Sequence, residues 1–465
     1  MLNKSEFLIF LDSPLHFWAY KHGLYTSPKS ELAEQFKRQG YDVETCVAEY
    51  FRALIPQGVI EQKTFFTKEL ECRTDFLVYD EGTNSYDLYE VKSSTDVKLD
   101  HEYDILFQYI VASQTITIRN LYIVYLNKEY ERGAVLDFEQ LFKIRDVTDL
   151  ITTRNDEVER LINDALNIAT KDSPDGLLEC FKPKNCPCPQ LCFPLLPEYS
   201  IYSLSNCSEK MTRELRASGI LDINDIPDSF NLSHKQRIQL ISTKLKSPVI
   251  DTQRIAEFIS RIQFPLHFLD YESYSWSIPQ YNRHRVYENV VFQYSLHIQK
   301  TRNSTLDHHE YLAITTDDPI KLIAKDITEK INGSGSILVW NKDFEKRCNR
   351  DMARIYPEYR EKLYSINERI IDLGDIFSKQ MYVDYRFKGS WSIKNILPVL
   401  VPDLDYKKME ISNGTLAMTT WESIVYGNLI PQKKNLLIDA LLKYCELDTY
   451  AMYRILEEVI KRLTI

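Results

Sequence analysis

The stretch from Leu266 to Glu272 constrains the fold of this chain more than any other. Its sequence, Leu-His-Phe-Leu-Asp-Tyr-Glu, reads as a buried β-strand that carries two carboxylates two residues apart. Because successive side chains of a strand alternate between its faces, Asp270 and Glu272 point to one side, while Phe268 and Leu269 help to fix the segment in a core. Adjacent carboxylates repel each other unless a cation lies between them, and such hard oxygen ligands suit Mg²⁺ or Mn²⁺. The strand therefore predicts a divalent metal site.

Two later segments add further acids to this pair. One reads as a strand end that leads into a helix, Leu338-Val-Trp-Asn-Lys-Asp-Phe-Glu345, and it carries Glu345 beside an aromatic residue. Near the C-terminus, Tyr444 and Asp448 lie four residues apart and therefore share one face of a helix. We expect these segments to contribute to one acidic site.

This order of motifs resembles that of the DEDDy 3′–5′ exonucleases, which have an RNase H-like fold. The resemblance implies catalytic roles for five residues: Asp270, Glu272, Glu345, Tyr444 and Asp448. The acids would hold two divalent ions, Mg²⁺ or Mn²⁺, around the scissile phosphate, and the tyrosine would orient the attacking water. The family has Asp at the position of Glu345, so Asp343 is the alternative residue there.

A second acidic group is predicted in the N-terminal third. Asp75 lies in one strand-like segment, and Glu90 and Lys92 lie in the next, with a turn-rich segment between them. A hairpin centred between Gly82 and Thr83 places Asp75 opposite Glu90, because both are equally far from that centre, and paired residues share a face. Lys92 lies two residues further on and shares this face. An Asp, a Glu and a Lys are therefore expected to converge, unless they form a solvent-facing charged ladder.

These three residues resemble the core of the RecB-type PD-(D/E)XK nucleases. The resemblance implies that the two acids bind a metal ion and that the lysine polarises a phosphate or positions water. Gln108, on the helix after the core strands, matches a glutamine that the family uses beside the site. The family's tyrosine four residues later is absent, because Ala112 stands there. Upstream, Glu44 or Glu49 is a candidate for a further metal ligand.

Four cysteines follow this region: Cys180, Cys186, Cys188 and Cys192. RecB-like nucleases often hold a [4Fe–4S] cluster with one cysteine near the N-terminus and three after the core. Three of the four match that pattern, Cys180, Cys186 and Cys192, but Ser13 stands in place of the first cysteine. Three alternatives remain open: Cys188 completes the cluster, zinc binds instead, or no metal binds. The other cysteines are expected to be small core residues: Cys46, Cys72, Cys207, Cys348 and Cys445.

The periodicity predicts an α/β chain of two nuclease domains joined by a helical segment. With 465 residues and 44% hydrophobic content, the chain is large enough for two or three cores. Breaks near 200 and 260 divide it into a PD-(D/E)XK restriction-endonuclease-like domain over 1–200, a helical segment over 201–260 and an RNase H-like exonuclease domain over 261–465. Helices are expected over 1–30, 31–55, around Gln108 and over 154–170. The expected strands are 65–66, 73–79, 86–91, 121–125, 266–271, 290–298 and 336–340.

Several other segments carry weaker signals. Residues 211–227 resemble a helix–Gly-turn–helix unit that grips a DNA backbone, with a plain helical linker as the alternative. Residues 292–297 read as a core strand, in which His297 is expected to be a buried, hydrogen-bonded histidine. Residues 389–394, which end at Lys394, are expected to form a loop that touches phosphates. Asp372 is expected to cap a helix, with a further acid of the site as the alternative.

Composition limits the classes of protein that fit. The net charge of −10 argues against nucleic-acid binding through bulk charge, although a metal-dependent nuclease can confine its basic groups to a groove. No apolar run approaches the roughly 18 residues that span a bilayer, and the N-terminus lacks a signal-peptide pattern. We therefore expect a cytoplasmic protein without membrane contact. Nine cysteines in such a chain favour a metal site over disulfides.

As a whole, the chain resembles a prokaryotic family that fuses a RecB-like nuclease to a DEDDy exonuclease. The resemblance implies a metal-dependent nuclease that cleaves phosphodiester bonds of DNA, or of RNA, in DNA repair, recombination or defence. Nucleic acid, DNA more than RNA, is the expected partner, and protein partners are left open. The alternative is a nucleic-acid-binding or scaffold protein whose nuclease folds have lost catalysis. The departures at Ser13 and Ala112 favour this alternative for the N-terminal half.

Overall fold

The structure, a computed structural model, describes residues 1–26, 31–55, 57–177 and 179–463. Its internal contacts divide the chain into two compact units. Unit 1 comprises Met1–Pro194 and Trp276–Glu288, and unit 2 comprises Leu195–Ser275 and Asn289–Ile465. Both units are mixed α/β, as the periodicity predicts. The segment that we expected to form a separate linker, 201–260, belongs to unit 2.

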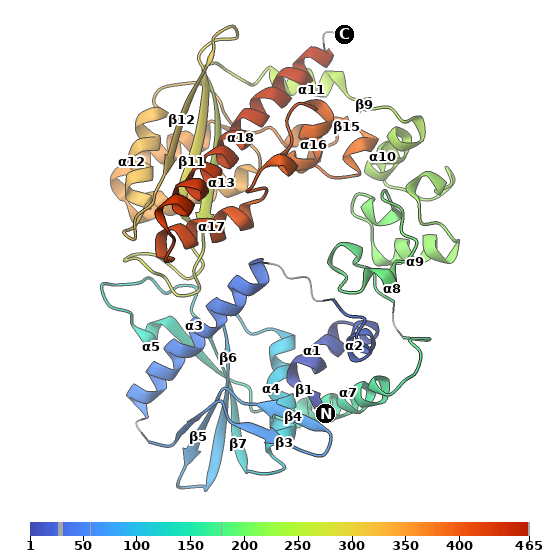
Figure 1. Ribbon diagram of the computed structural model, residues 1–465, viewed down its shortest axis with the longest axis vertical. Coiled ribbons are helices and arrows are strands. Elements are labelled where there is room, and N and C mark those ends of the chain that lie inside the picture. The colour runs from blue at the N-terminus through green and yellow to red at the C-terminus, as the bar shows by residue number, and fades with distance from the viewer. Residues whose placement is uncertain (27–30, 56, 178, 464–465) are drawn as a thin grey trace. The chain divides into compact units, whose positions relative to one another are not determined.

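Unit 1 is built on a five-stranded sheet in the order β2-β5-β6-β7-β8 (Figure 1). These strands are β2 (Val59–Glu61), β5 (Phe76–Asp80), β6 (Ser85–Lys92), β7 (Ile118–Leu126) and β8 (Phe142–Asp146). The parallel strands β6 and β7 are connected by the crossover helix α4 (Leu99–Ala112), as a parallel pair requires. A second, small sheet contains β1 (Leu2–Asn3), β4 (Leu70–Arg73) and β3 (Thr64–Phe66).

The hairpin of β5 and β6 has the predicted register. Tyr79 pairs with Tyr86, which confirms the predicted turn centre. The single strand predicted over 73–79 is wrong, because β4 ends before β5 begins and the two belong to different sheets. Between them the backbone carbonyl of Asp75 accepts a hydrogen bond from the N–H of Gln62. A local strand pattern does not specify its pairing partner, so this change of sheet is invisible in the sequence.

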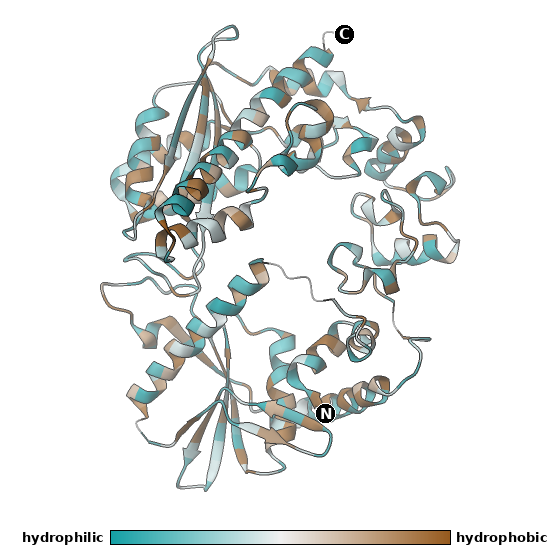
Figure 2. Ribbon diagram, viewed as in Figure 1, coloured by the Kyte–Doolittle hydropathy of each residue, from teal (hydrophilic) through white to brown (hydrophobic). Residues whose placement is uncertain are grey.

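Eight helices of unit 1 lie in its described residues: α1 (Lys4–Asp12), α2 (Pro14–Lys21), α3 (Glu31–Leu54), α4, α5 (Phe138–Leu141), α6 (Leu150–Thr153), α7 (Asn155–Ala169) and α8 (Pro189–Cys192). The helical pattern over 1–30 breaks at Ser13, because Pro14 takes the first position of a new helix. Hydrophilic and hydrophobic residues alternate along α3 (Figure 2), and its buried face includes Val43, Val47 and Phe51. Such amphipathic helices cover the sheet with one face.

Unit 2 is also built on a five-stranded sheet, in the order β12-β11-β10-β13-β14. The strands are β12 (Leu306–Leu312), β11 (Val290–Gln299), β10 (Leu266–Tyr274), β13 (Ile337–Val339) and β14 (Ile370–Asp372). The predicted strands β10, β11 and β13 are confirmed. The edge strands β12 and β14 were missed, since β12 is mostly polar and β14 is only three residues long.

Helices cover both faces of this sheet. Tyr271 of β10 donates its phenolic hydrogen to Asn349 of α13 (Lys342–Ile355). On the other face, Ser295 of β11 bonds Thr449 of α18 (Pro431–Leu463), which crosses the strands (Figure 1). Asp270 pairs with Ser295, so its side chain lies on the α18 face. His297 is buried on this face and bonds Thr449, as expected for a core histidine.

The other helices of unit 2 surround this core. They are α9 (Glu209–Ala217), α10 (His234–Leu245), α11 (Thr252–Ile259), α12 (Ile320–Lys330), α14 (Arg360–Glu368), α15 (Asp375–Ser378), α16 (Ile393–Leu400) and α17 (Gly414–Tyr426). The short strands β9 (Val249–Ile250) and β15 (Tyr382–Val383) pair with each other. Among the described residues, we find no helix with both the length and the apolar character needed to cross a bilayer.

The predicted helix–Gly-turn–helix over 211–227 is only half present. α9 ends before Gly219, which has a φ of 73°, but the residues that follow form a single 3₁₀ turn over Ile223–Asp225. Asp222 caps this turn by accepting from the N–H of Asn224 at 2.8 Å, and α10 begins only at His234. The turn-favouring side chain of Asp222 thus stops a second helix from starting directly.

The connection between β10 and β11, Trp276–Glu288, belongs to unit 1. Its residues Ile278 and Val286 are buried in a hydrophobic cluster with the apolar face of α3. Tyr287 donates a hydrogen bond of 2.6 Å to the backbone carbonyl of Ser93, the residue after β6. This connection is therefore an integral part of unit 1.

Candidate metal centres

Three acids from two elements of unit 2 meet on one side of its sheet. Asp270 and Glu272 project from one face of β10, and Asp448 reaches them from α18. One carboxylate oxygen from each residue lies within 4.8 Å of the other two. Glu272 and Asp448 are buried, with 8% and 7% of their surface exposed. The structure thus brings together the strand pair and the helix acid of the sequence motifs.

The pKa values of all three carboxyl groups are raised, because ionising them in this site costs free energy. Burial raises the pKa of Asp270 well above its usual range, and the charges of Asp448 and Glu272 raise it further. Burial and the charge of Asp448 raise the pKa of Glu272 to about 8, and burial raises that of Asp448 to about 6. A bound cation would offset this repulsion. The donor set consists of carboxylate oxygens, which fits Mg²⁺ or Mn²⁺.

Glu345, in the first turn of α13, lies close to this group. It is 1% exposed, and burial raises its pKa well above the usual range, with contributions from Asp372 and Glu272. Among the described residues, its Oε2 atom has no hydrogen-bond partner. Glu345 is not one of the three residues with oxygens within 4.8 Å of one another. The alternative residue, Asp343, is exposed, so the placement favours Glu345.

Asp372 fixes the start of α13 and thereby the position of Glu345. Its carboxylate accepts hydrogen bonds from the backbone N–H groups of Asn341 and Lys342, at 3.2 and 3.1 Å. It also accepts from the N–H of Gly374 at 2.9 Å. Asp372 is not the predicted N-cap residue, because the N-cap positions of α13 and α15 belong to Asn341 and Gly374; it instead satisfies the first N–H groups of α13 from the end of β14.

A lysine and two tyrosines border the acids. Tyr406 Oη donates to Asp448 Oδ1 at 2.5 Å. Lys394 Nζ lies 3.2 Å from Tyr444 Oη and 5.2 and 5.4 Å from the ring centres of Tyr444 and Tyr406. Burial lowers the pKa of Lys394. Tyr444 was expected here. Lys394 was expected in a phosphate-contacting loop but lies in the first turn of α16, and Tyr406, in the 3₁₀ turn Tyr406–Lys408, was missed because no motif marks it.

Unit 1 gathers its own acids around β6. Glu90, 1% exposed, accepts from Lys92 Nζ at 2.6 Å and from Lys4 Nζ at 2.9 Å through Oε1. Its Oε2 atom accepts from Gln108 Nε2 at 2.6 Å. Asp75 directly precedes the Phe76–Tyr89 pair of the hairpin, and its carboxylate accepts from the backbone N–H of Val91 in β6 at 2.8 Å. The four predicted residues of this site are therefore brought together.

Two residues of this site were missed in the sequence. Asp104 accepts from Gln108 at 3.0 Å and pairs with Lys92, and its spacing of four residues from Gln108 on α4 is a signal that could have revealed it. Lys4 has no local signal, because it arrives from the first turn of α1. Although burial opposes the effect, Lys92 and Lys4 hold the pKa of Glu90 well below its usual range. The two ammonium groups thus balance much of the buried charge.

An open cleft adjoins this site. It has a volume of about 640 Å³, and its lining includes Lys4, Lys37, Glu44, Arg73 and Asp75. Burial, followed by the charge of Glu90, raises the pKa of Glu44, so this residue lies near the acids. The other upstream candidate, Glu49, is exposed. The cleft lining combines three basic side chains with four carboxylates, those of Glu6, Glu44, Glu71 and Asp75.

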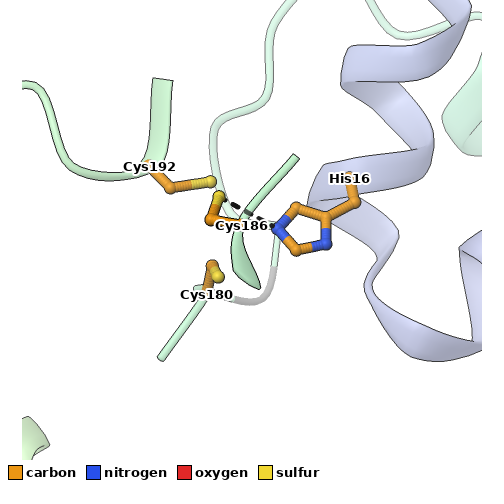
Figure 3. Close-up of side chains that lie close together, drawn as sticks. All are labelled: His16, Cys180, Cys186 and Cys192. Carbon is orange, nitrogen blue, oxygen red and sulfur yellow. Dashed lines mark hydrogen bonds between the residues drawn. The ribbon is translucent and has the colours of Figure 1, made fainter. Parts of the chain in front are cut away.

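The cysteine-rich segment meets α2 in unit 1. Figure 3 shows Cys180, Cys186 and Cys192 with their sulfur atoms near the imidazole of His16. One ligand atom from each of the four lies within 4.8 Å of the others. Cys188 is outside this group, although its Sγ lies 3.6 Å from that of Cys192. His16 was missed, because the family pattern places its N-terminal ligand at the position of Ser13.

Ser13 itself has another role. Its hydroxyl oxygen accepts from the N–H of His16 at 3.3 Å and caps α2. Of the cysteines expected in cores, Cys72, Cys348 and Cys445 are buried, whereas Cys46 and Cys207 are only half-buried. The sulfur of Cys445 lies 3.7 Å from Asp270 Oδ2.

Comparisons with known proteins identify relatives without an assigned activity. Residues 267–392 match a family described as a domain of unknown function (DUF2779). The chain is 27% identical over 218 residues to the uncharacterized protein MG366 of Mycoplasma genitalium, covering 42% of this chain and 32% of the relative. It is 23% identical over 280 residues to the uncharacterized protein UU173 of Ureaplasma parvum, covering 55% and 38%. The chain thus spans about a third of the length of these curated relatives.

Proposed function

We propose that the protein is a metal-dependent nuclease that hydrolyses phosphodiester bonds, with a 3′–5′ exonuclease site of the DEDDy type in unit 2. The observation that carries this proposal is the convergence of ligand oxygens from Asp270, Glu272 and Asp448 within 4.8 Å of one another, in buried or half-buried positions that raise the pKa values of the three carboxyl groups. A fold tolerates such repulsion where a cation offsets it. The unpartnered Oε2 of Glu345, among the described residues, is a further oxygen donor close by.

The residues around the acids support roles in hydrolysis. Two divalent ions, when bound by the acids, supply charge that activates water and stabilises the leaving oxygen. Lys394 would attract the phosphate, because its Nζ lies beside Tyr444 at the acids. Tyr444 would orient the attacking water through its hydroxyl. Tyr406 would keep Asp448 ionised, because its hydrogen bond favours the charged carboxylate.

Unit 1 supports a second nuclease site of the PD-(D/E)XK type. Asp75 and Glu90 would bind the metal ion, Lys92 would polarise the phosphate, and Gln108 holds Glu90 in place. The adjoining cleft would receive DNA rather than RNA, in accordance with the resemblance of the site. The pathway that follows from this activity is DNA repair, recombination or defence.

One observation favours a second candidate function for unit 1. The ammonium group of Lys4 lies 2.9 Å from Glu90 and 3.4 Å from Asp104, where it supplies positive charge that a metal ion would otherwise bring. A site neutralised in this way would bind nucleic acid in its cleft without cleaving it. Unit 1 would then be the catalytically degenerate, nucleic-acid-binding half of the protein.

The test is shortening of 5′-end-labelled DNA and RNA, single- and double-stranded, from the 3′ end in Mg²⁺, in Mn²⁺ and in EDTA. Asp270→Asn should lower the metal-dependent rate of 3′-end shortening by about 100-fold or more, because it removes a charge that the transition state requires. Glu358→Gln, at an exposed glutamate of unit 2, is the matched control and should retain the parental rate. If the parent protein binds these substrates but releases no nucleotide with either metal, the nuclease proposal is wrong and the binding function holds.

A further inference from the structure

Four ligand atoms of unit 1 come from segments that are more than 160 residues apart. His16 lies in the first turns of α2, and the three cysteines lie between the end of α7 and the end of α8. His16 Nε2 lies 3.6 Å from Cys186 Sγ, and one ligand atom from each of His16, Cys180, Cys186 and Cys192 lies within 4.8 Å of the others (Figure 3). Three of these residues are buried and Cys192 is half-buried. This is the arrangement of a metal site with a Cys₃His donor set.

We propose that these four residues bind a single Zn²⁺ ion and that His16 is its fourth ligand. A tetrahedral zinc ion with Zn–S bonds of about 2.3 Å and a Zn–N bond of about 2.0 Å holds its ligand atoms roughly 3.5–3.8 Å apart. The measured separation of 3.6 Å between His16 and Cys186 agrees with this geometry. A [4Fe–4S] cluster places each ligand on a different iron atom, so its ligand atoms stand farther apart. The compact group therefore fits one ion better than a cluster.

The surroundings of His16 orient its ring for such a role. The other ring nitrogen, Nδ1, lies 3.6 Å from Asp12 Oδ2, which leaves Nε2 directed at the sulfurs. A carboxylate behind a histidine ligand fixes the tautomer and the ring orientation of metal-bound histidines. The backbone N–H of His16 donates to the Ser13 hydroxyl oxygen at 3.3 Å, and this cap also fixes the start of α2.

Further contacts hold α2 against the cysteine segment. Trp18 Nε1 donates to the carbonyl of Lys171 at 2.8 Å, and the N–H and hydroxyl of Thr26 donate to the carbonyl of Pro187 at 3.0 and 2.9 Å. Trp18 and Ala19 are buried in one hydrophobic cluster with Cys180, Cys186 and Cys188. A zinc ion here would join the N-terminal helices to the end of unit 1 and close a long loop of chain. Its role is structural, and it is independent of the proposed phosphodiester chemistry.

Cys188 provides a matched control within the same segment. Its Sγ lies 3.6 Å from Cys192 Sγ, but it is not one of the four residues with mutually close ligand atoms. We therefore expect Cys188→Ser to keep the metal. His16→Cys, which restores a thiolate donor, should also keep it, whereas His16→Ala and Cys186→Ser should lose it.

The experiment is elemental analysis of the full-length protein, purified without oxygen from cells supplied with both zinc and iron. The expected result is one zinc per chain, no iron and no colour, with zinc lost in His16→Ala and Cys186→Ser. Replacement of zinc by Co²⁺ should give the absorption bands of a tetrahedral, thiolate-bound ion in the parent, in Cys188→Ser and in His16→Cys.

Three outcomes would overturn the proposal. Iron with acid-labile sulfide and a brown colour in the parent protein would show a cluster instead of zinc. Full zinc content in His16→Ala, together with its loss in Cys188→Ser, would make Cys188 the fourth ligand. Parent protein that contains neither metal and shows no thiolate–Co²⁺ bands after titration would show that the group binds no metal. The first and third outcomes are read from the parent protein, so a variant that fails to fold does not obscure them; the second is read only where both variants fold.

Discussion

Replacing Glu272 by glutamine should stabilise the metal-free protein, even though Glu272 belongs to the proposed catalytic centre. Burial and the charge of Asp448 raise the pKa of Glu272 from its ordinary value of 4.5 to about 8. The folded state therefore binds a proton that the unfolded state releases, and ionising this carboxyl costs folding free energy. At about 1.4 kcal/mol for each pKa unit, the cost is on the order of 5 kcal/mol once the group is ionised in both states.

The sign of this effect sets the pH window. Well below pH 4.5 the carboxyl is mostly protonated in both states, so the cost is small. The cost grows as the pH rises and is complete above about pH 8, where the folded protein also carries the ionised group. Glutamine removes the charge and should abolish this loss of stability at high pH.

The measurement is thermal unfolding in EDTA at pH 5 and pH 9. A change of 1 kcal/mol in unfolding free energy shifts the melting temperature of a domain of this size by roughly 2–4 °C. If local movement relaxes about half of the repulsion, Glu272→Gln should melt about 5–10 °C above the parent at pH 9 and within about 2 °C of it at pH 5. Glu358→Gln, at an exposed glutamate, is the control and should match the parent at both values. Saturating Mn²⁺ should stabilise the parent more than the variant, because the variant lacks a ligand. A variant that melts at or below the parent at pH 9 in EDTA would refute the argument from charge repulsion.

Three further outcomes are expected. Tyr406→Phe removes a hydrogen bond that lowers the pKa of Asp448, so the acidic limb of the pH–rate profile should move to higher pH; an unmoved limb would contradict this role. Lys4→Met should increase the affinity of unit 1 for Mn²⁺ about tenfold, because the competing ammonium group beside Glu90 is lost. The affinity is measured by calorimetric titration in an Asp270→Asn background, which weakens the metal site of unit 2. An unchanged affinity would mean that Lys4 does not compete with the metal. Gly389→Ala should lower the melting temperature by several degrees, since Gly389 has a φ of 73° and an added Cβ would lie 2.3 Å from a backbone oxygen. Gly219 has the same φ but open space around it, so Gly219→Ala should cost only about 1 kcal/mol of stability. Equal losses of stability in the two variants would remove the steric argument.

Local sequence patterns predicted the parts of both acidic sites that depend on a single element or a tight turn. The alternation of strand side chains placed Asp270 and Glu272 on one face, and the turn centre fixed the register that aligns Asp75 with Glu90. These features depend on periodicity and turn geometry, which a sequence carries directly.

The residues that were missed reach their sites through tertiary packing. Lys4 arrives at Glu90 across 86 residues, His16 reaches Cys186 across 170, and Tyr406 meets Asp448 across 42. No local period encodes such meetings, because they follow from how helices and loops pack on the sheets.

The connection over 276–288 has a consequence for the order in which the protein can fold during its synthesis. Ile278 and Val286 complete a hydrophobic cluster of unit 1, yet they are translated after β10 of unit 2. An emerging chain that has reached Pro194 therefore still lacks part of the apolar cover of α3. The hydrophobic cluster of unit 1 can be completed only when residue 288 has left the ribosome. The folding of unit 1 therefore depends on a segment that is inserted in the sequence of unit 2.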